Sequence, residues 1–289
     1  MSEAKAKAAS IPKVPVAQEV DDEGGPPMTF WEHLDELRKR LTACVVTLVV
    51  AAFGAYYIKE RLFALLTQPF SAAWRAKGLT GGPTMHFGTP AGSIIAYVKL
   101  SMVAGFVFSA PIIFYQLWSF VAPGLYAREK RFVIPFVLLS TLLFAGGGFF
   151  AWRAAFPFTF DFFLDTAGNV GGETGIIIQP TVMMDAYIDF ALQMIVAFGI
   201  MFELPLFILF LSLAGIVNYL QLISFGRWFV LIAFIAAAVF TPPDMTSQVI
   251  MAVPMIGLYG VSIILAFLFG KKPTEAQREA YRRKKAAKT

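Results

Sequence analysis

The sequence predicts an all-α, multi-pass membrane protein, and three observations support that class. Of its 289 residues, 57% are apolar and only 15% are charged, whereas soluble domains have roughly 45–50% apolar and about 25% charged residues. The mean hydropathy is +0.66. Six stretches are long and apolar enough to be candidate membrane-spanning helices. These observations indicate an integral membrane protein with several spans rather than a soluble domain.

The six spans are expected at about 41–58, 93–121, 132–156, 181–213, 226–240 and 247–269. Four of them contain a proline, at Pro111, Pro135, Pro205 and Pro254. Proline is tolerated inside a membrane helix because neighbouring groups satisfy the backbone atoms that it frees. We therefore expect kinked helices rather than a straight bundle.

The span lengths predict an uneven bilayer. The purely apolar part of the fifth span, residues 228–240, has 13 residues; at roughly 1.5 Å per residue it is about 20 Å long, against a hydrocarbon core of about 30 Å. The fourth span, 181–213, has 33 residues and must tilt or project. Short spans next to a long one should thin the bilayer locally. In the third span, Gly146, Gly147 and Gly148 would permit bending or a close helix approach.

Positive charge predicts that both termini are cytosolic. Arg38, Lys39 and Arg40 precede the first span. Residues 128–131 add three basic side chains between the second and third spans, and the tail after residue 270 holds eight. The opposite segments have fewer basic residues, and Asp161, Asp165 and Glu173 lie on that side between the third and fourth spans. This asymmetry has the direction of the positive-inside rule.

The two ends of the chain differ in composition from its middle. Residues 1–27 have no apolar signal-peptide core and are expected to be a disordered cytosolic tail. Residues 271–289 form a basic cytosolic tail that favours contact with anionic membrane lipids over any nucleic acid. That leaves 28–270 as one transmembrane domain. Within it, residues 61–74 are expected to form an amphipathic helix along the outer interface.

Catalytic and metal-binding patterns are missing from the sequence. Cys44 is the single cysteine, so it cannot form an internal disulfide, and it falls inside the first span. With one Cys and two His residues, a structural zinc site is not expected. No G-x-S-x-G, H-E-x-x-H or P-loop pattern occurs. We therefore expect neither an enzyme nor a cofactor, and His33 and His86 are interpreted as surface residues.

Glu203 is the most informative residue. It lies within the apolar run 198–213, far in sequence from any other charge. A charged side chain deep in a bilayer costs several kcal/mol or more on the scales in use. An intramembrane acid is therefore a functional-site hypothesis, and Gln248 near the outer end of the sixth span could share one polar cluster with it.

Three further charged segments have a structural interpretation, and one of them also has a functional one. Residues 29–41 fit a juxtamembrane helix that Thr29 and Glu32 would begin with a capping box. Residues 120–131 fit a short anchored loop, or a loop whose Glu129 receives a cationic ligand at the membrane surface. In residues 240–248, Asp244 or Thr246 fits an N-cap of the sixth span.

Five sequence blocks resemble one family. They are HLDELRKRL (33–41), SAPIIFYQLWSFVAPGLY (109–126), REKR (128–131), FGIMFELP (198–205) and TPPD (241–244) with Gln248. In this order on a six-span chain they resemble TatC, the multispanning receptor subunit of the twin-arginine protein translocase. The resemblance covers nearly the whole membrane part and excludes the two tails.

The resemblance implies both a function and a site. TatC-like proteins bind the twin-arginine signal peptides of folded cargo at the cytosolic face of the bacterial inner membrane. Glu36 and Glu129 would take the two arginines, since carboxylates pair with guanidinium groups in a bidentate, charge-assisted way that lysine cannot reproduce. Positions that match motif residues shaping this site are Arg38, Arg40, Phe120 and Leu125.

The resemblance also implies partners and an energy source. Glu203 would lie on the concave face of a glove-like fold, while Gln248 and Asp244 would lie where small single-span subunits of the TatA/TatB type dock. Such a protein works in an oligomeric complex, and transport uses the proton-motive force rather than a nucleotide. The rival interpretation is a proton-coupled secondary transporter or channel, which six spans, broken helices and a midplane acid also fit. No internal repeat favours that rival.

Overall fold

The computed structural model describes the chain in eight segments: residues 30–79, 82–121, 133–165, 168–169, 177–178, 180–241, 245–275 and 277–279. Six helical stretches in them are long and apolar enough to cross a membrane. They are Trp31–Tyr57, Gly92–Val121, Val133–Asp165, Met184–Ala214, Tyr219–Phe240 and Met245–Phe269. The expected helical class with six candidate spans is confirmed.

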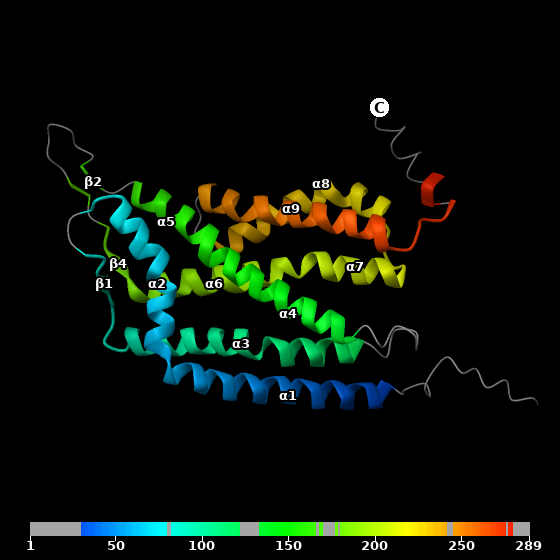
Figure 1. The fold of residues 1–289 in the computed structure, drawn as a ribbon, viewed down its shortest axis with the longest axis horizontal. Coiled ribbons are helices and arrows are strands. Elements are labelled where there is room, and N and C mark those ends of the chain that lie inside the picture. Colours follow the sequence, from blue (N-terminus) through cyan, green and yellow to red (C-terminus); the bar gives the residue numbers. More distant parts are fainter. Residues whose placement is uncertain are drawn as a thin grey trace, which may run out of the picture.

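The first span and the helix expected before it form one continuous helix, α1 (Phe30–Tyr57). It runs antiparallel to α3 (Gly92–Val121) along one side of the molecule (Figure 1). The two backbones touch where Gly105 faces Ala52, since a Cβ on Gly105 would lie 2.6 Å from the Ala52 backbone. A glycine lets membrane helices approach this closely. Because α1 packs mainly on α3, this contact sets which residues of the two helices face each other.

The third span continues beyond the expected end near residue 156. α4 (Val133–Phe150) passes through a π-helical turn, η3 (Ala151–Ala155), into α5 (Phe156–Asp165). Proline normally breaks a helix because it has no N–H and because its ring clashes with the carbonyl four residues back. The wider π-turn directly before Pro157 relieves this conflict. The helix therefore continues where the sequence predicts a loop.

The fourth span is two helices, α6 (Met184–Phe202) and α7 (Leu204–Ala214), joined at Glu203. The Glu203 N–H donates to the Ile200 carbonyl three residues back, at 3.1 Å, and Pro205 has no N–H to restore the regular ladder. α6 packs on α4, where a Cβ on Gly147 would overlap the Phe198 carbonyl. The close approach that the glycine run predicts is confirmed at Gly147.

The fifth span, α8 (Tyr219–Phe240), begins two turns before the expected start at Gly226. Asn218 and Gln221 form a capping box: the Gln221 N–H donates to Asn218 Oδ1 at 3.1 Å, and the Asn218 N–H donates to Gln221 Oε1 at 3.0 Å. α8 has 22 residues, about 33 Å of helix at the usual rise. The expectation of a short fifth span is wrong, and bilayer thinning derived from its length loses its basis.

The sixth span is α9 (Met245–Phe269), which packs on α7 and α8. The end of α9 is tied to α7, since the Lys271 N–H donates to the Ser212 carbonyl at 3.1 Å. Gly215, with φ +82°, ends α7 in the left-handed conformation that glycine favours. The last two spans therefore form a unit with the second half of the fourth.

α2 (Lys59–Ala76) is the amphipathic helix expected after the first span, and it crosses the ends of the long helices (Figure 1). Two short two-stranded sheets lie at the same end. β1 (Met85–His86) pairs in parallel with β4 (Val182–Met183). β2 (Gly168–Asn169) pairs antiparallel with β3 (Ile177–Ile178).

Buried aromatic rings hold α2 on the long helices. Phe70 of α2 packs edge-on against Phe160 of α5 at 5.5 Å between ring centroids, and Tyr187 of α6 stacks on Phe160 at 5.4 Å. The Tyr187 hydroxyl donates to the Leu66 carbonyl at 2.8 Å. The core of the described residues is therefore densest at this end, where α2, α5 and α6 meet.

The molecule has two distinct ends along its long axis (Figure 1). α1 begins and α9 ends at one of them, which we call the terminal end, and α3 ends and α4 begins there as well. The opposite end carries α2 and the short strands, and we call it the α2 end. Both described termini of the chain therefore lie on the same side of the helical bundle.

Candidate functional site

At the terminal end, α1 directs a stripe of polar side chains toward α3. His33, Glu36 and Arg40 are half-buried, whereas most residues around them on α1 are exposed. Their spacing of three and four residues places them on one face of the helix. On α3 the facing residues are Gln116 and Phe120, four residues apart, which are also half-buried. Two antiparallel helices thus bring five site residues together.

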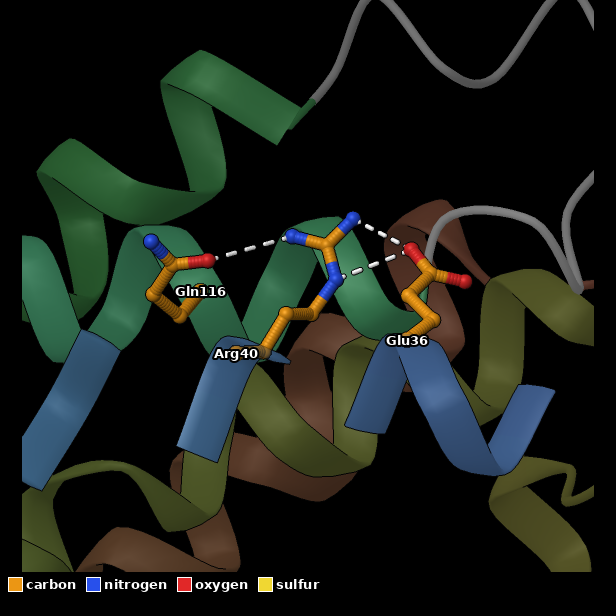
Figure 2. A network of polar contacts seen from close by, with 3 residues as sticks. All are labelled: Glu36, Arg40 and Gln116. Carbon is orange, nitrogen blue, oxygen red and sulfur yellow. Dashed lines mark hydrogen bonds and ion pairs between the residues drawn. The ribbon is translucent and has the colours of Figure 1, made fainter. Parts of the chain in front are cut away.

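Arg40 is the centre of this cluster (Figure 2). Its Nε and Nη2 atoms donate to Glu36 Oε1 at 2.9 and 2.5 Å. Its Nη1 atom donates across the helix interface to Gln116 Oε1 at 3.3 Å. The guanidinium therefore joins α1 to α3 and neutralises Glu36 within the protein.

The second oxygen of Glu36 has no hydrogen-bond partner among the described residues. Oε2 is buried, and no hydrogen-bond donor reaches it within the part of the chain that the structure describes. A buried acceptor without a partner costs about 1–3 kcal/mol, and more when it carries charge. Arg40 thus occupies one oxygen of the Glu36 carboxylate, and the other oxygen can accept a further hydrogen bond.

His33 contacts the end of α3. Its ring stacks on Phe120, with 4.5 Å between the centroids and 19° between the planes. Phe120 is the second-last residue of α3, so the stack ties the start of α1 to the last turn of that helix. The interpretation of His33 as an isolated surface residue is therefore wrong.

The remaining site residues expected from the sequence do not join this cluster. Arg38 is exposed; it lies two residues from Glu36, which turns it to a different face of the helix. Glu129 and Leu125 lie outside the described residues. The structure thus brings together Glu36, Arg40 and Phe120 of the six expected residues.

Glu203 lies in a second polar group, at the break between α6 and α7. The Ser140 hydroxyl of α4 hydrogen-bonds with the Glu203 carboxyl group, and the Trp118 indole N–H of α3 donates to the same Ser140 oxygen at 2.8 Å. Glu203 Oε1 is buried without a hydrogen-bond partner among the described residues. This group connects three spans through polar contacts.

Gln248 is not part of the Glu203 group. It is half-buried in the first turn of α9, at the α2 end, and no hydrogen bond joins it to Glu203 within the described ranges. The expectation of a shared cluster is wrong because Glu203 follows the last turn of α6, far along the bundle from the start of α9. Asp244 lies outside the described residues.

Two residues of the first cluster were not expected from the sequence, His33 as a site residue and Gln116. The sequence contained a signal for both residues, because His33 precedes Glu36 by three positions and Gln116 precedes Phe120 by four, and each spacing is about one helical turn.

Among the residues the structure describes, no group of three or more His, Cys, Asp and Glu side chains could hold a metal ion.

These features define a class of protein. It is a multi-pass membrane protein with six membrane-length helices and a carboxylate–guanidinium cluster at one end of them. Comparison with known families then identifies the chain more closely. The model of the Sec-independent protein translocase protein (TatC) family matches residues 32–254, and the chain belongs to this family.

Curated relatives carry the same family name. TatC of Desulforapulum autotrophicum is 41% identical over 251 residues, which are 87% of this chain and 88% of that protein. TatC of Aquifex aeolicus is 36% identical over 252 residues, 87% of this chain and 100% of that protein. Similarity thus extends over nearly the full length of both relatives.

A solved structure has the same fold. The crystal structure described as the twin-arginine translocase receptor TatC superposes with a TM-score of 0.71 at 35% sequence identity, covering 82% of this chain and 99% of that chain. The chain is therefore a translocase protein of the TatC family, and these comparisons favour that function over the rival secondary transporter.

Proposed function

We propose that this protein receives twin-arginine signal peptides of folded cargo at its terminal end, through Glu36 and Glu129. The observation that carries the proposal is the state of Glu36: one carboxylate oxygen holds a guanidinium, and the other is buried with no donor among the described residues. A second guanidinium that reached Oε2, or displaced Arg40 from Oε1, would satisfy this carboxylate.

The contact with Arg40 supports a guanidinium as the preferred cation at this position. Arg40 uses two nitrogens on Glu36 and a third on Gln116. A guanidinium supplies these donors in one plane, whereas an ammonium group is a compact point charge without that geometry. A signal-peptide arginine is thus preferred to lysine for the same reason that Arg40 fits here.

The rest of the receptor is proposed from the family resemblance. Glu129 and Leu125 belong to residues 122–132, which directly follow α3 and the Phe120 ring that His33 holds. Glu129 would take the second arginine. Arg38 and Leu125 would shape the site around it.

We place the terminal end in the cytosol and the protein in a bacterial inner membrane. What supports this orientation is that both described termini and the start of α4 lie at one end (Figure 1), and that most basic residues flank that end. Under this orientation Glu36 lies where an unfolded signal sequence first meets the membrane.

We further propose that the protein organises partner subunits rather than acting as an enzyme. Small single-span subunits of the TatA/TatB type would dock near Gln248 and Asp244. The signal's apolar segment would lie along a concave, glove-like face that contains Glu203. The assembly would be an oligomeric complex driven by the proton-motive force, with both tails in the cytosol.

Photo-crosslinking of a twin-arginine signal peptide in membranes tests the receptor. Glu36→Gln removes the charge that strengthens a guanidinium hydrogen bond, so crosslinking should fall about tenfold or more. Glu129→Gln should do the same. Asp35→Asn is the matched control, because Asp35 is an exposed carboxylate next to Glu36 on the same helix, and it should stay within about twofold of wild type.

A peptide with both arginines replaced by lysine should crosslink weakly to every variant. If both Glu36→Gln and Glu129→Gln crosslinked at the wild-type level, these carboxylates would not be part of the receptor. Equal losses in Glu36→Gln and Asp35→Asn would show that only general negative charge matters, which would also contradict the proposal.

A further inference from the structure

A cleft at the α2 end is not used by the proposed receptor. It has a volume of about 620 Å³ and lies between α2 and the π-turn η3 with the start of α5. Gln68 and Ala72 line it from α2, and Trp152, Arg153 and Pro157 line it from the other side. The π-turn matters here because it sets the direction of Trp152 and Arg153, and such turns often occur at functional sites.

Arg153 is the cation of this cleft. It is exposed, and no carboxylate among the described residues lies within ion-pair distance of it. Asp161 also lines the cleft, and it shares Lys77 of the α2 end with Asp165, at 2.9 and 2.5 Å. Arg153 is therefore the cleft cation that no described carboxylate pairs with.

The position of Arg153 along its helix places it at a membrane boundary. Arg153 follows Val133, the first residue of α4, by 20 positions, or about 30 Å of helix, which is about the thickness of the hydrocarbon core. Trp152 beside it is a residue type enriched at such boundaries. An arginine here faces the headgroup layer of the leaflet at the α2 end.

An apolar cavity adjoins the cleft at Trp152. It has a volume of about 410 Å³, and its lining includes Leu62, Val103, Phe149 and Trp152. The Trp152 indole N–H donates to the Leu65 carbonyl of α2 at 2.9 Å, which fixes the ring between the two spaces. The cleft that contains Arg153 and the apolar cavity thus share Trp152 as a common wall.

We propose that this pair of spaces binds one anionic phospholipid from the leaflet at the α2 end. The phosphate pairs with the Arg153 guanidinium, whose fork matches phosphate oxygens, and the Gln68 amide donates a further hydrogen bond. One acyl chain enters the apolar cavity past Trp152. In the orientation proposed above this is the outer leaflet, although the site itself is independent of cargo recognition.

Native mass spectrometry of the purified protein with phosphatidylglycerol tests the site. Wild-type protein should retain one phosphatidylglycerol and should retain phosphatidylethanolamine, which has no net charge, at least about fivefold less. Arg153→Gln should lower phosphatidylglycerol retention to the same level. Arg75→Gln is the control, because Arg75 is an exposed arginine of α2 outside the cleft, and it should retain lipid as wild type does.

A second variant and a competition with inorganic phosphate test the same inference. Ala72→Phe fills the cleft without changing charge, so it should also lower retention, and it serves if Arg153→Gln does not yield a monodisperse protein. Inorganic phosphate should not displace the lipid, because it has no chain for the cavity. Full retention in Arg153→Gln or in Ala72→Phe, equal loss in Arg75→Gln, or displacement by phosphate alone would each overturn the assignment.

Discussion

In the proposed receptor, the contribution of His33 can be tested separately from the charged residues around it. Its ring stacks on Phe120, and an aromatic pair contributes about 0.5–1.5 kcal/mol beyond buried area. His33→Ala should lower signal-peptide crosslinking by about two- to tenfold, because the last turn of α3 loses its support. His33→Phe retains a stacked ring and should crosslink nearly as wild type. Equal losses in both variants would show that stacking is not what the residue supplies.

Lys77 has a predictable pH dependence. Hydrogen bonds to Asp161, which has the larger effect, and to Asp165 raise the pKa of Lys77 above its ordinary value of 10.5. Lys77 Nζ lies 2.9 Å from Asp161 Oδ1 and 2.5 Å from Asp165 Oδ1. Because this pKa is higher in the folded state, the charged Lys77 stabilises the folded protein fully below pH 10.5. That stabilisation is lost as the pH rises through the pKa of Lys77 in the folded state.

The thermal unfolding temperatures of wild type and Lys77→Gln, measured in detergent at a series of pH values, check this sign. The wild type should unfold at a slightly higher temperature than the variant from neutral pH up to about pH 10, and the difference should shrink above that value. The effect should be small because exposed ion pairs contribute little. A difference that grows with alkaline pH would contradict the assignment.

At the scale of single elements, the capping box decides where α8 begins. Asn218→Ala should destabilise the first turn by about 1 kcal/mol, and backbone amides of residues 219–222 should exchange with deuterium faster. Asn218→Asp keeps a side-chain acceptor for the Gln221 N–H and should remain close to wild type. Unchanged exchange in Asn218→Ala would show that packing on α9, rather than the cap, starts the helix.

The contact of α4 with α6 depends on one glycine of a run of three. A Cβ at Gly147 would overlap the Phe198 carbonyl, whereas nothing lies within 4 Å of the Cβ position at Gly146. Gly147→Ala should therefore lower the unfolding temperature clearly in detergent, because the helices must separate. Gly146→Ala should be neutral or slightly stabilising, since alanine is favoured over glycine in a helix. Similar effects of the two substitutions would contradict this packing argument.

At the scale of the whole molecule, the orientation can be measured with single cysteines. The chain has only Cys44, so Cys44→Ser provides a cysteine-free background. Thr84→Cys lies at the α2 end and Lys272→Cys follows α9, and both positions are exposed. A membrane-impermeant maleimide added from the periplasmic side should label Thr84→Cys only, and inverted membrane vesicles should give the reverse. Labelling of both variants from one side would overturn the proposed topology.

The sequence by itself determined the helical class, the six spans and the family, because each depends on local properties. Apolar runs of membrane length require helices in a bilayer, and the blocks around Glu36, Phe120 and Glu203 are contiguous in the chain. The missed boundaries at Pro157 and Tyr219 arose where local signals compete. A π-turn relieved a proline, and a capping box began a helix two turns before the expected start.

Only the tertiary structure decided which side chains meet. Helical spacing places His33, Glu36 and Arg40 on one face, but the register between α1 and α3 determines that Gln116 and Phe120 face them. That register depends on the close approach at Gly105. The separation of Gln248 from Glu203 and the cleft at Arg153 likewise come from packing between distant segments, and such contacts have no pattern within a single stretch of sequence.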